Sequence, residues 1–280
     1  MSERAEYWPA PAKLNLMLRV VGRRPDGYHL LQTVFQFLDH GDRLRFRLRD
    51  DGRILRPGDI DGVAEADDLV VRAARLLQQV AGVSRGVEIG LDKRLPMGAG
   101  LGGGSSDAAT TLVALNRLWG CGLDRAALAR LGLRLGADVP VFVHGFAAWA
   151  EGVGERLQPV DLPEPWYLVL VPPCHVSTAV VFADPRLTRD SPRITIRDFL
   201  AGSRENDCVS VVRRRFPAVA EAMEWLGRFA EPQLTGTGAG VFACFPDEMS
   251  ARAVWKKAAE RYPAFVARGR NLSPLREREH

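Results

Sequence analysis

Apolar and polar residues follow two different periods along this chain. Over residues 12–21 an apolar side chain falls on every second position, as in a strand with one buried face. Over residues 108–119, Leu112, Leu115 and Trp119 instead share one stripe of a helix. The two periods predict strands over residues 12–21, 34–38, 43–48, 87–91, 146–150, 167–171 and 265–268, and helices over residues 108–119, 124–135, 209–216, 218–230 and 248–261. A further helix is expected after a cap at Asp67 or Asp68, and a short one after Ser177.

A proline-rich segment divides the chain. Pro159, Pro163 and Pro165 fall within seven residues, between two predicted strands. A chain of 280 residues is long enough for two ordinary domains, which we place at residues 1–158 and 159–280. The order of elements in the second segment predicts an α+β layer with an antiparallel sheet, and its last residues can pack back on the first domain.

A glycine-rich stretch lies between the predicted strand 87–91 and the helix 108–119. Five glycines fall within residues 98–104, and two serines and Asp107 follow. Where side chains are missing, backbone N–H groups can close on phosphate oxygens, and the dipole of a following helix favours the anion. Flexible linkers rarely lie between an apolar strand and an apolar helix. The stretch therefore predicts a phosphate-binding loop.

Three common phosphate-binding motifs do not fit this loop. Residues 98–103 satisfy G-x-G-x-x-G, and Asp124 lies about twenty residues on, where a dinucleotide site needs an acid at a strand end. Asp124 instead has the position of a helix N-cap. A Walker loop would require G-K-[ST], and a protein kinase H-R-D and D-F-G; the sequence has neither set.

Other polar residues have two interpretations each. Lys13, Asn15 and Arg19 share one face of the first predicted strand, either solvated or reaching into a cleft. Asp138 precedes an apolar run, and a helix N-cap is nearly as good an interpretation of this residue as a functional carboxylate. Tyr28 beside His29 offers a stacking ring and a donor–acceptor group that suit a nucleobase, although packing alone would also explain them.

Composition and charge narrow the class of protein. The chain is 46% hydrophobic and 26% charged, as globular proteins are, and its net charge of +4 suits an anionic ligand. Over residues 43–49 the arginines alternate with apolar residues, so they form no concentrated basic stripe of the nucleic-acid-binding kind. The four cysteines form no C-x-x-C pair, which disfavours a zinc site or a disulfide framework. With no apolar run of membrane-spanning length and no signal-like start, we expect a cytoplasmic protein.

The glycine loop resembles P-x-G-x-G-L-G-[SG]-[SG]-S, the phosphate loop of the GHMP kinases (galactokinase, homoserine kinase, mevalonate kinase and relatives). Further stretches narrow the resemblance to the branch that acts on a cytidine-diphosphate substrate, and they span nearly the whole chain. They are PAKLNL (11–16), RRPDGYHLLQTVF (23–35), DKRLPMGAGLGGGSSDAAT (92–110), LGADVPVF (135–142), AEGVGE (150–155), ENDC (205–208), LTGTGAGVFA (234–243) and NLSPL (271–275).

The resemblance implies an α+β two-domain GHMP kinase fold. Its N-terminal domain is S5-like α/β and binds the nucleotide, its C-terminal domain is ferredoxin-like α+β, and the active site lies in the cleft between them. The implied reaction moves the γ-phosphate of ATP onto the 2-hydroxyl of 4-diphosphocytidyl-2-C-methyl-D-erythritol, a step of non-mevalonate isoprenoid synthesis. ATP and Mg²⁺ are the implied cofactors. We expect no nucleic-acid or membrane partner, and a monomer or weak homodimer.

The resemblance also implies residue roles. Asp138 would accept the hydroxyl proton with Lys13 beside it, Asn15 would contact the substrate diphosphate or hydroxyls, and the cytidine would lie near Tyr28, His29 and Phe182. Ser105 or Ser106 is the candidate magnesium ligand. The implied ATP-binding residues are Lys93, Pro96, Met97, Gly98, Ala99, Gly100, Leu101, Gly102, Gly103, Gly104, Ser105 and Ser106.

The chain departs from the family pattern at three positions, and two other functions stay open. Gly240 stands where Cys or Ser is common, Asp68 where an asparagine near the adenine is common, and Asp107 where Asn also occurs. One alternative is a GHMP kinase for another small alcohol, such as homoserine or mevalonate. The other is a non-catalytic nucleotide- or RNA-binding protein on an S5-like fold, which salt-dependent RNA binding without kinase activity would support.

Overall fold

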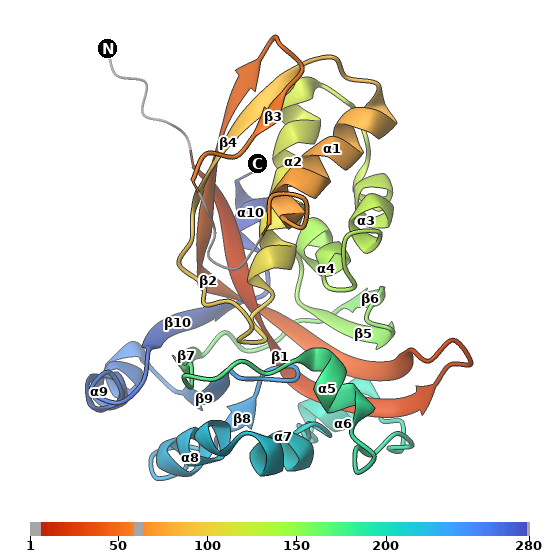
Figure 1. The fold of residues 1–280 in the computed structure, drawn as a ribbon. Helices are drawn as coiled ribbons and strands as arrows, with labels where there is room; N and C mark the ends of the chain where they lie inside the picture. The colour runs from red at the N-terminus through yellow and green to blue at the C-terminus, as the bar shows by residue number, and fades with distance from the viewer. Residues whose placement is uncertain (1–6, 59–63, 279–280) are drawn as a thin grey trace.

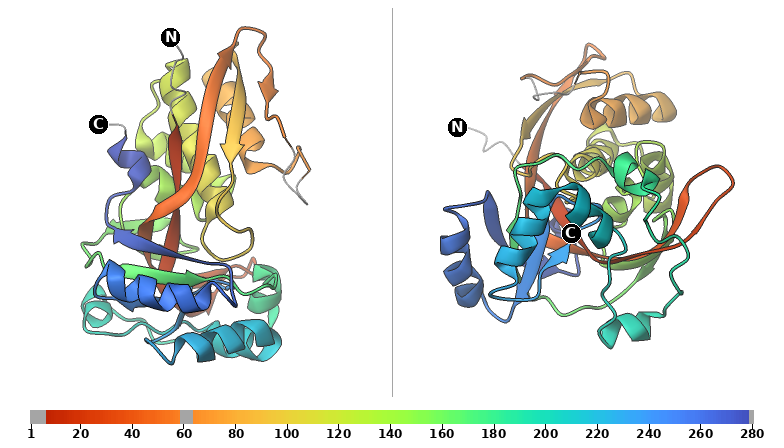
Figure 2. Two further views of the ribbon diagram at one scale, coloured as in Figure 1. Left: turned by 90° about the vertical axis from the view of Figure 1, so that its left-hand side faces the viewer. Right: turned by 60° about the horizontal axis from the view of Figure 1, so that its bottom comes forward.

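A computed structural model describes residues 7–58 and 64–278. The helices gather in two groups along a long antiparallel hairpin (Figures 1 and 2), α1–α4 beside one part of it and α5–α9 beside the other. The strands are β1 (Trp8–Arg23), β2 (His29–Arg49), β3 (Ile54–Leu55), β4 (Gly86–Asp92), β5 (Ala148–Gly152), β6 (Arg156–Pro159), β7 (Trp166–Leu170), β8 (Gln233–Leu234), β9 (Val241–Phe245) and β10 (Ala264–Arg270). The helices are α1 (Leu69–Ala81), α2 (Gly103–Trp119), α3 (Arg125–Leu133), α4 (Val139–His144), α5 (Thr178–Ala183), α6 (Ile196–Leu200), α7 (Val209–Arg215), α8 (Pro217–Leu226), α9 (Glu248–Ala258) and α10 (Pro274–Glu277).

The hairpin of β1 and β2 organises the sheet. β1 pairs along its length with residues 29–44 of β2, from Trp8 opposite Leu44 to Arg23 opposite His29. The turn between them contains Gly27 at φ 91°, a conformation that glycine adopts without strain. β2 also pairs with β4, β5 and β10, and β10 pairs with β7, so the described strands form one sheet that crosses the proline-rich segment. The domain boundary at residue 159 stays a prediction.

The prediction of two strands over residues 34–38 and 43–48 is wrong, because β2 runs through both without a break. Residues 39–42, between the two predicted strands, are polar apart from Gly41. Tertiary contacts keep them in the strand: Asp42 accepts hydrogen bonds from the backbone of Arg94 and Leu95, and a Cβ at Gly41 would lie 2.2 Å from the carbonyl oxygen of Ala10. Glycine is needed there for close backbone approach.

Separate apolar cores underlie the two helix groups. The first packs α1–α4 on the sheet and includes Trp8, Phe142 and, from α10, Leu275. The second packs α5, α7, α8 and α9 against β7 and β9. A third cluster, which includes Leu14 and Phe242, lies where the two meet. Among the described residues, no helix combines the length and the apolar character that crossing a membrane requires.

Local capping signals place several helix starts. Asp68, Asp124 and Ser177 each accept a hydrogen bond from a backbone N–H in the first turn of α1, α3 and α5. α2 instead begins at Gly103, five residues before the predicted start, so the last glycines of the loop already belong to the helix. The short helices α4, α6 and α10 were not predicted.

Candidate active site

Two cavities meet at the glycine loop. One, of about 670 Å³, is lined by β1, the β1–β2 turn, α5 and Asp138. The other, of about 390 Å³, is lined by residues 67–70, Lys93 and most of the loop. Gly100 and Gly102 line both cavities. The loop therefore lies where the two cavities adjoin, so that molecules held in them would approach each other beside Gly100 and Gly102.

Lys13 and Asp138 face each other on the larger cavity. The Lys13 ammonium lies 3.3 Å from the Asp138 carboxylate, and it donates hydrogen bonds to Asn15 Oδ1 at 2.5 Å and to the carbonyl of Gly100 at 2.9 Å. Lys13 is 3% exposed, whereas the Asp138 side chain is 35% exposed toward the cavity. A buried ammonium thus links the possible base to the phosphate loop.

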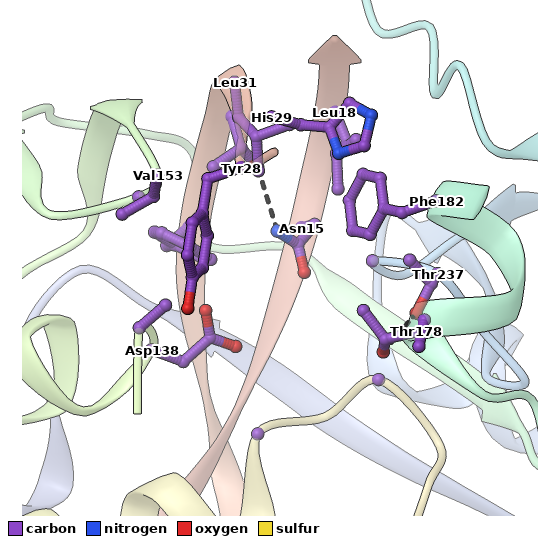
Figure 3. A pocket seen from close by; sticks show the side chains of 18 of the residues that line it. Asn15, Leu18, Tyr28, His29, Leu31, Asp138, Val153, Thr178, Phe182 and Thr237 are labelled. Carbon is purple, nitrogen blue, oxygen red and sulfur yellow. Dashed lines mark hydrogen bonds between the residues drawn. The ribbon is translucent and has the colours of Figure 1, made fainter. Parts of the chain in front are cut away.

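Asp138 does not act as a helix cap. It occupies the residue before α4, but its side chain makes no capping hydrogen bond to the helix N-terminus. The carboxylate instead lies 3.3 Å from the Lys13 ammonium. Asp138 also lines the larger cavity (Figure 3). The side chain of Asp138 therefore does not cap α4, and its functional role stays a prediction.

Asn15 joins the hairpin to a second glycine-rich turn, LTGTGAG at residues 234–240. Its side chain donates to Thr33 Oγ1 at 2.9 Å (dashed in Figure 3), and its backbone N–H donates to Thr235 Oγ1 at 3.1 Å. Arg19 does not share this face as predicted, because the register of β1 shifts between Asn15 and Met17. Leu18 lines the cavity instead, and Arg19 pairs with Glu205 at 3.0 Å.

The glycine loop opens α2 in the way that phosphate binding requires. Gly102, at φ 73°, is the N-cap of this 17-residue helix and has no side chain to cover the N–H groups of the first turn. Those groups and the helix dipole form an anion site beside the smaller cavity. On its other side the loop pairs with the second glycine-rich turn, since Gly240 N–H donates to Ala99 O. A Cβ at Gly240 would lie 2.5 Å from that oxygen, which explains the absence of a side chain at this departure from the family pattern.

We predict that Gly102→Ala lowers kcat by at least tenfold. Its Cβ would lie 2.8 Å from Phe142 Cζ and 3.1 Å from Lys13 Cε, so the loop or Lys13 must move. The positive φ adds roughly 1–2 kcal/mol of backbone strain. Gly120→Ala is the matched control, because Gly120 has φ 70° but nothing within 4 Å of its Cβ position. Thermal unfolding should show the strain of the positive φ in both variants and a further loss of stability in Gly102→Ala from its close contacts. Steady-state ADP release should show kcat lost only in Gly102→Ala; equal kcat in both would remove the loop geometry from catalysis.

Lys93 is held by two carboxylates beneath the loop. Its ammonium lies 2.6 Å from Asp42 and 2.7 Å from Asp107. Burial disfavours the charged form of Lys93, but Asp107 and Asp42 outweigh this and raise its pKa. Burial raises the pKa of Asp107 to about 7, because a single ammonium cannot compensate two carboxylates in the same buried cluster. Lys93 lines the smaller cavity, as its predicted place near ATP requires. Its ammonium, however, is already paired with Asp42 and Asp107.

We predict that Asp107→Asn flattens the pH dependence of stability between about pH 4 and pH 7. The folded pKa of Asp107 lies above the value near 3.9 of an unfolded Asp, so the native state retains a proton that the unfolded state loses, and stability falls as pH rises through this window. Urea denaturation at pH 5 and pH 8 should show that Asp107→Asn gains stability relative to wild type at the higher pH. Asp124→Asn, at an exposed N-cap, is the control. A constant difference between wild type and Asp107→Asn would contradict the raised pKa.

The two candidate magnesium ligands are placed differently. Ser105 lines the smaller cavity, whereas the side chain of Ser106 is fully buried and its hydroxyl has no hydrogen-bond partner in the described residues. Within the same described ranges, no group of three or more His, Cys, Asp or Glu is placed to hold a metal. Ser105 is therefore the candidate that faces the cavity, where it could join phosphate oxygens and water around a Mg²⁺; its role as a ligand stays a prediction.

Of the predicted nucleobase residues, His29 and Phe182 lie on the larger cavity away from Asp138, whereas the Tyr28 ring points toward Asp138 (Figure 3). His29 and Phe182 stack on each other at 4.9 Å with 20° between the rings, and Tyr28 is 65% exposed. Because His29 and Phe182 are already in contact, a base cannot lie between these two rings in this arrangement.

The sequence interpretation missed several polar residues of this cavity. Thr33 lines it beside Asn15, and Thr178 and Thr237 share a hydrogen bond of 2.9 Å on its opposite side. Thr237 lies in the second glycine-rich turn, which was a signal in itself. Asp68 is also not free to reach an adenine, because it caps α1 and pairs with buried Arg56.

Known proteins resemble this chain along most of its length. A family model, the GHMP kinases N terminal domain, matches residues 68–146. The 4-diphosphocytidyl-2-C-methyl-D-erythritol kinase of Methylococcus capsulatus is 61% identical over 96% of this chain and 93% of its own length; that of Pseudomonas aeruginosa strain PAO1 is 58% identical over 95% of each. A crystal structure of 4-(cytidine 5'-diphospho)-2C-methyl-D-erythritol kinase superposes with a TM-score of 0.83 at 34% identity, covering 94% of this chain and 99% of that one. A mevalonate kinase structure shares the fold at a TM-score of 0.71 and 14% identity, covering 95% and 99%.

Proposed function

The chain belongs to the 4-diphosphocytidyl-2-C-methyl-D-erythritol kinases of the GHMP superfamily, and we propose that Lys13 and Asp138 carry out the phosphoryl transfer. The activity is ATP-dependent phosphorylation of the 2-hydroxyl of 4-diphosphocytidyl-2-C-methyl-D-erythritol in the non-mevalonate route to isoprenoids. The observation that carries the residue assignment is the 3.3 Å contact between a buried ammonium and a cavity-lining carboxylate, beside the phosphate loop.

Asp138 is proposed to accept the proton of the attacking hydroxyl. A tertiary alcohol is a weak nucleophile, and a carboxylate within hydrogen-bond reach can take its proton as the bond to phosphorus forms. The Lys13 ammonium lies 3.3 Å from that carboxylate and forms an ion pair with it. The same ammonium contacts the Gly100 carbonyl, so it also lies where charge on the transferring phosphoryl group can be offset.

The two cavities are proposed to hold the two substrates. ATP would occupy the smaller cavity, with its phosphates on the N–H groups at the start of α2 and Mg²⁺ at Ser105. The cytidylated alcohol would occupy the larger one, with its hydroxyl at Asp138, its diphosphate or hydroxyls near Asn15, and its base near Tyr28, His29 and Phe182. Loop residues Gly100 and Gly102, common to both cavities, would lie at the point of transfer.

The test is ADP release from ATP and Mg²⁺ with three alcohols: 4-diphosphocytidyl-2-C-methyl-D-erythritol, homoserine and mevalonate. We expect turnover with the cytidylated alcohol alone, because the larger cavity, of about 670 Å³, is lined by Tyr28, His29 and Phe182 as well as by Asp138. Turnover with homoserine or mevalonate, and none with the cytidylated alcohol, would contradict the assignment. Cytoplasmic location, and a monomer or weak homodimer without nucleic-acid partners, remain predictions that fractionation and sedimentation can check.

A further inference from the structure

His29 is held from behind by an arginine that the proposed mechanism does not use. Arg189 Nε donates to His29 Nε2 at 3.1 Å. The remaining nitrogens of the same guanidinium donate to three backbone carbonyls, those of Leu187, Phe182 and Asp184, at 2.8–3.0 Å. Four hydrogen bonds therefore fix the position of the guanidinium, and they tie it to the segment that carries Phe182.

This contact determines which nitrogen of His29 carries the proton. A guanidinium has only donors, so the imidazole nitrogen that faces it must accept. A neutral imidazole has one acceptor and one donor, and with Nε2 accepting, the proton lies on Nδ1. Burial, followed by the positive charges of Arg189 and Arg23, lowers the pKa of His29, which keeps the ring neutral near pH 7.

The protonated nitrogen is available to a ligand. His29 lines the larger cavity, whereas Arg189 is not among the residues that line it. Stacking on Phe182 restricts the orientation of the imidazole ring (Figure 3). Within residues 7–58 and 64–278, the structure gives His29 Nδ1 no hydrogen-bond partner. His29 thus has a fixed ring, a satisfied Nε2 and an unused donor.

We propose that Arg189 is a positioning residue that fixes His29 as a hydrogen-bond donor, so that the base of the substrate must present an acceptor to it. The proposal rests on the proposed function, since it takes the base to be the cytosine of the cytidylated alcohol. Cytosine has two adjacent acceptors, N3 and O2. N3 of uracil instead carries a proton, so at that position a uracil N–H would face the His29 N–H, and two donors would meet. A site built around one donor rejects a group that cannot accept from it.

The first test is the tautomer of His29 in the wild-type enzyme. A long-range proton–nitrogen NMR correlation spectrum at pH 7.5, assigned with a His29→Gln variant, identifies which ring nitrogen is protonated. We expect the Nδ1–H form, both without ligands and with ATP. An Nε2–H form would overturn the proposal. The measurement involves no turnover, so it stays informative even if the chain does not phosphorylate the cytidylated alcohol.

The second test compares Arg189→Gln with Arg186→Gln. Arg186 is an exposed arginine of the same segment, and its replacement removes the same charge near the site. We expect Arg189→Gln to mix the His29 tautomers and to raise KM for the cytidylated alcohol about tenfold, equivalent to about 1.4 kcal/mol or one hydrogen bond, with kcat and the KM for ATP changed less than twofold. Arg186→Gln should match wild type.

The outcomes of the second test separate positioning from simple structural support. Arg189→Lys retains a positively charged donor group with no acceptor, although on one nitrogen only. Compared with Arg189→Gln, it should recover part of the Nδ1–H population of His29 and part of the affinity for the cytidylated alcohol. A rise in KM for Arg189→Gln with the tautomer unchanged would overturn the proposal, because Arg189 would then act only by supporting the Phe182 segment. An equal rise in KM for Arg186→Gln would also overturn it, because charge alone would explain the effect.

Discussion

Replacing Lys13 by methionine should lower kcat by roughly 10³-fold, the scale on which a cation that stabilises a transferring phosphoryl group contributes. The ammonium is 3% exposed and contacts the Asp138 carboxylate, Asn15 Oδ1 and the Gly100 carbonyl. Methionine keeps most of the side-chain length without the charge or the donors. Because the charge acts mainly in the transition state, the KM for ATP should change less than tenfold.

Folding is the main alternative explanation for a loss of activity in Lys13→Met. Removing the donor leaves Asn15 Oδ1 buried without this partner, at a cost of about 1–3 kcal/mol. Thermal unfolding measured together with ADP release therefore separates the two effects, and Lys256→Met, at an exposed position of α9, is the control for the substitution itself. A folded Lys13→Met enzyme that retains kcat within tenfold of wild type would show that the ammonium does not act in the transfer.

The sequence predicted those features whose causes are local. Asp124 and Ser177 cap helices because a carboxylate or hydroxyl meets N–H groups two or three residues on, and this is visible in any short window. The loop and Asp138 were also recognisable, because their residue types and spacing resemble a known family.

Features that depend on distant residues could not be predicted. Asp42 remains within β2 because residues some fifty positions later donate to it. Arg189 reaches His29 across 160 positions, and although His29 was a candidate, no sequence signal marked Arg189. The shift between Asn15 and Met17 in β1 moved Arg19 off the cavity face, although strict alternation had placed it there. In each case the decisive interaction lies outside any local window.

The exchange of Asp138 for asparagine should lower kcat by 10²–10⁴-fold, the usual contribution of a positioned general base. Asparagine has the same shape, and the carboxylate makes no capping bond whose loss would destabilise α4, so the variant should fold, with some loss of stability because the buried Lys13 ammonium loses its ion pair. Isothermal titration with a non-hydrolysable ATP analogue should give an unchanged Kd, because Asp138 lines the larger cavity and not the smaller one. Asp124→Asn, which replaces a carboxylate that does cap a helix, should retain full kcat.

Combining the two substitutions tests whether Lys13 and Asp138 act as one unit. Their charged groups are 3.3 Å apart, and groups in such contact lose their contributions together. The double variant Lys13→Met/Asp138→Asn should therefore be about as slow as the slower single variant, and not slower by the product of the two effects. Multiplicative losses would mean that Lys13 stabilises the phosphoryl group independently of the base. If Asp138→Asn alone keeps kcat within tenfold of wild type, Asp138 is not the base, and Lys13 and positioning by the loop must account for the rate.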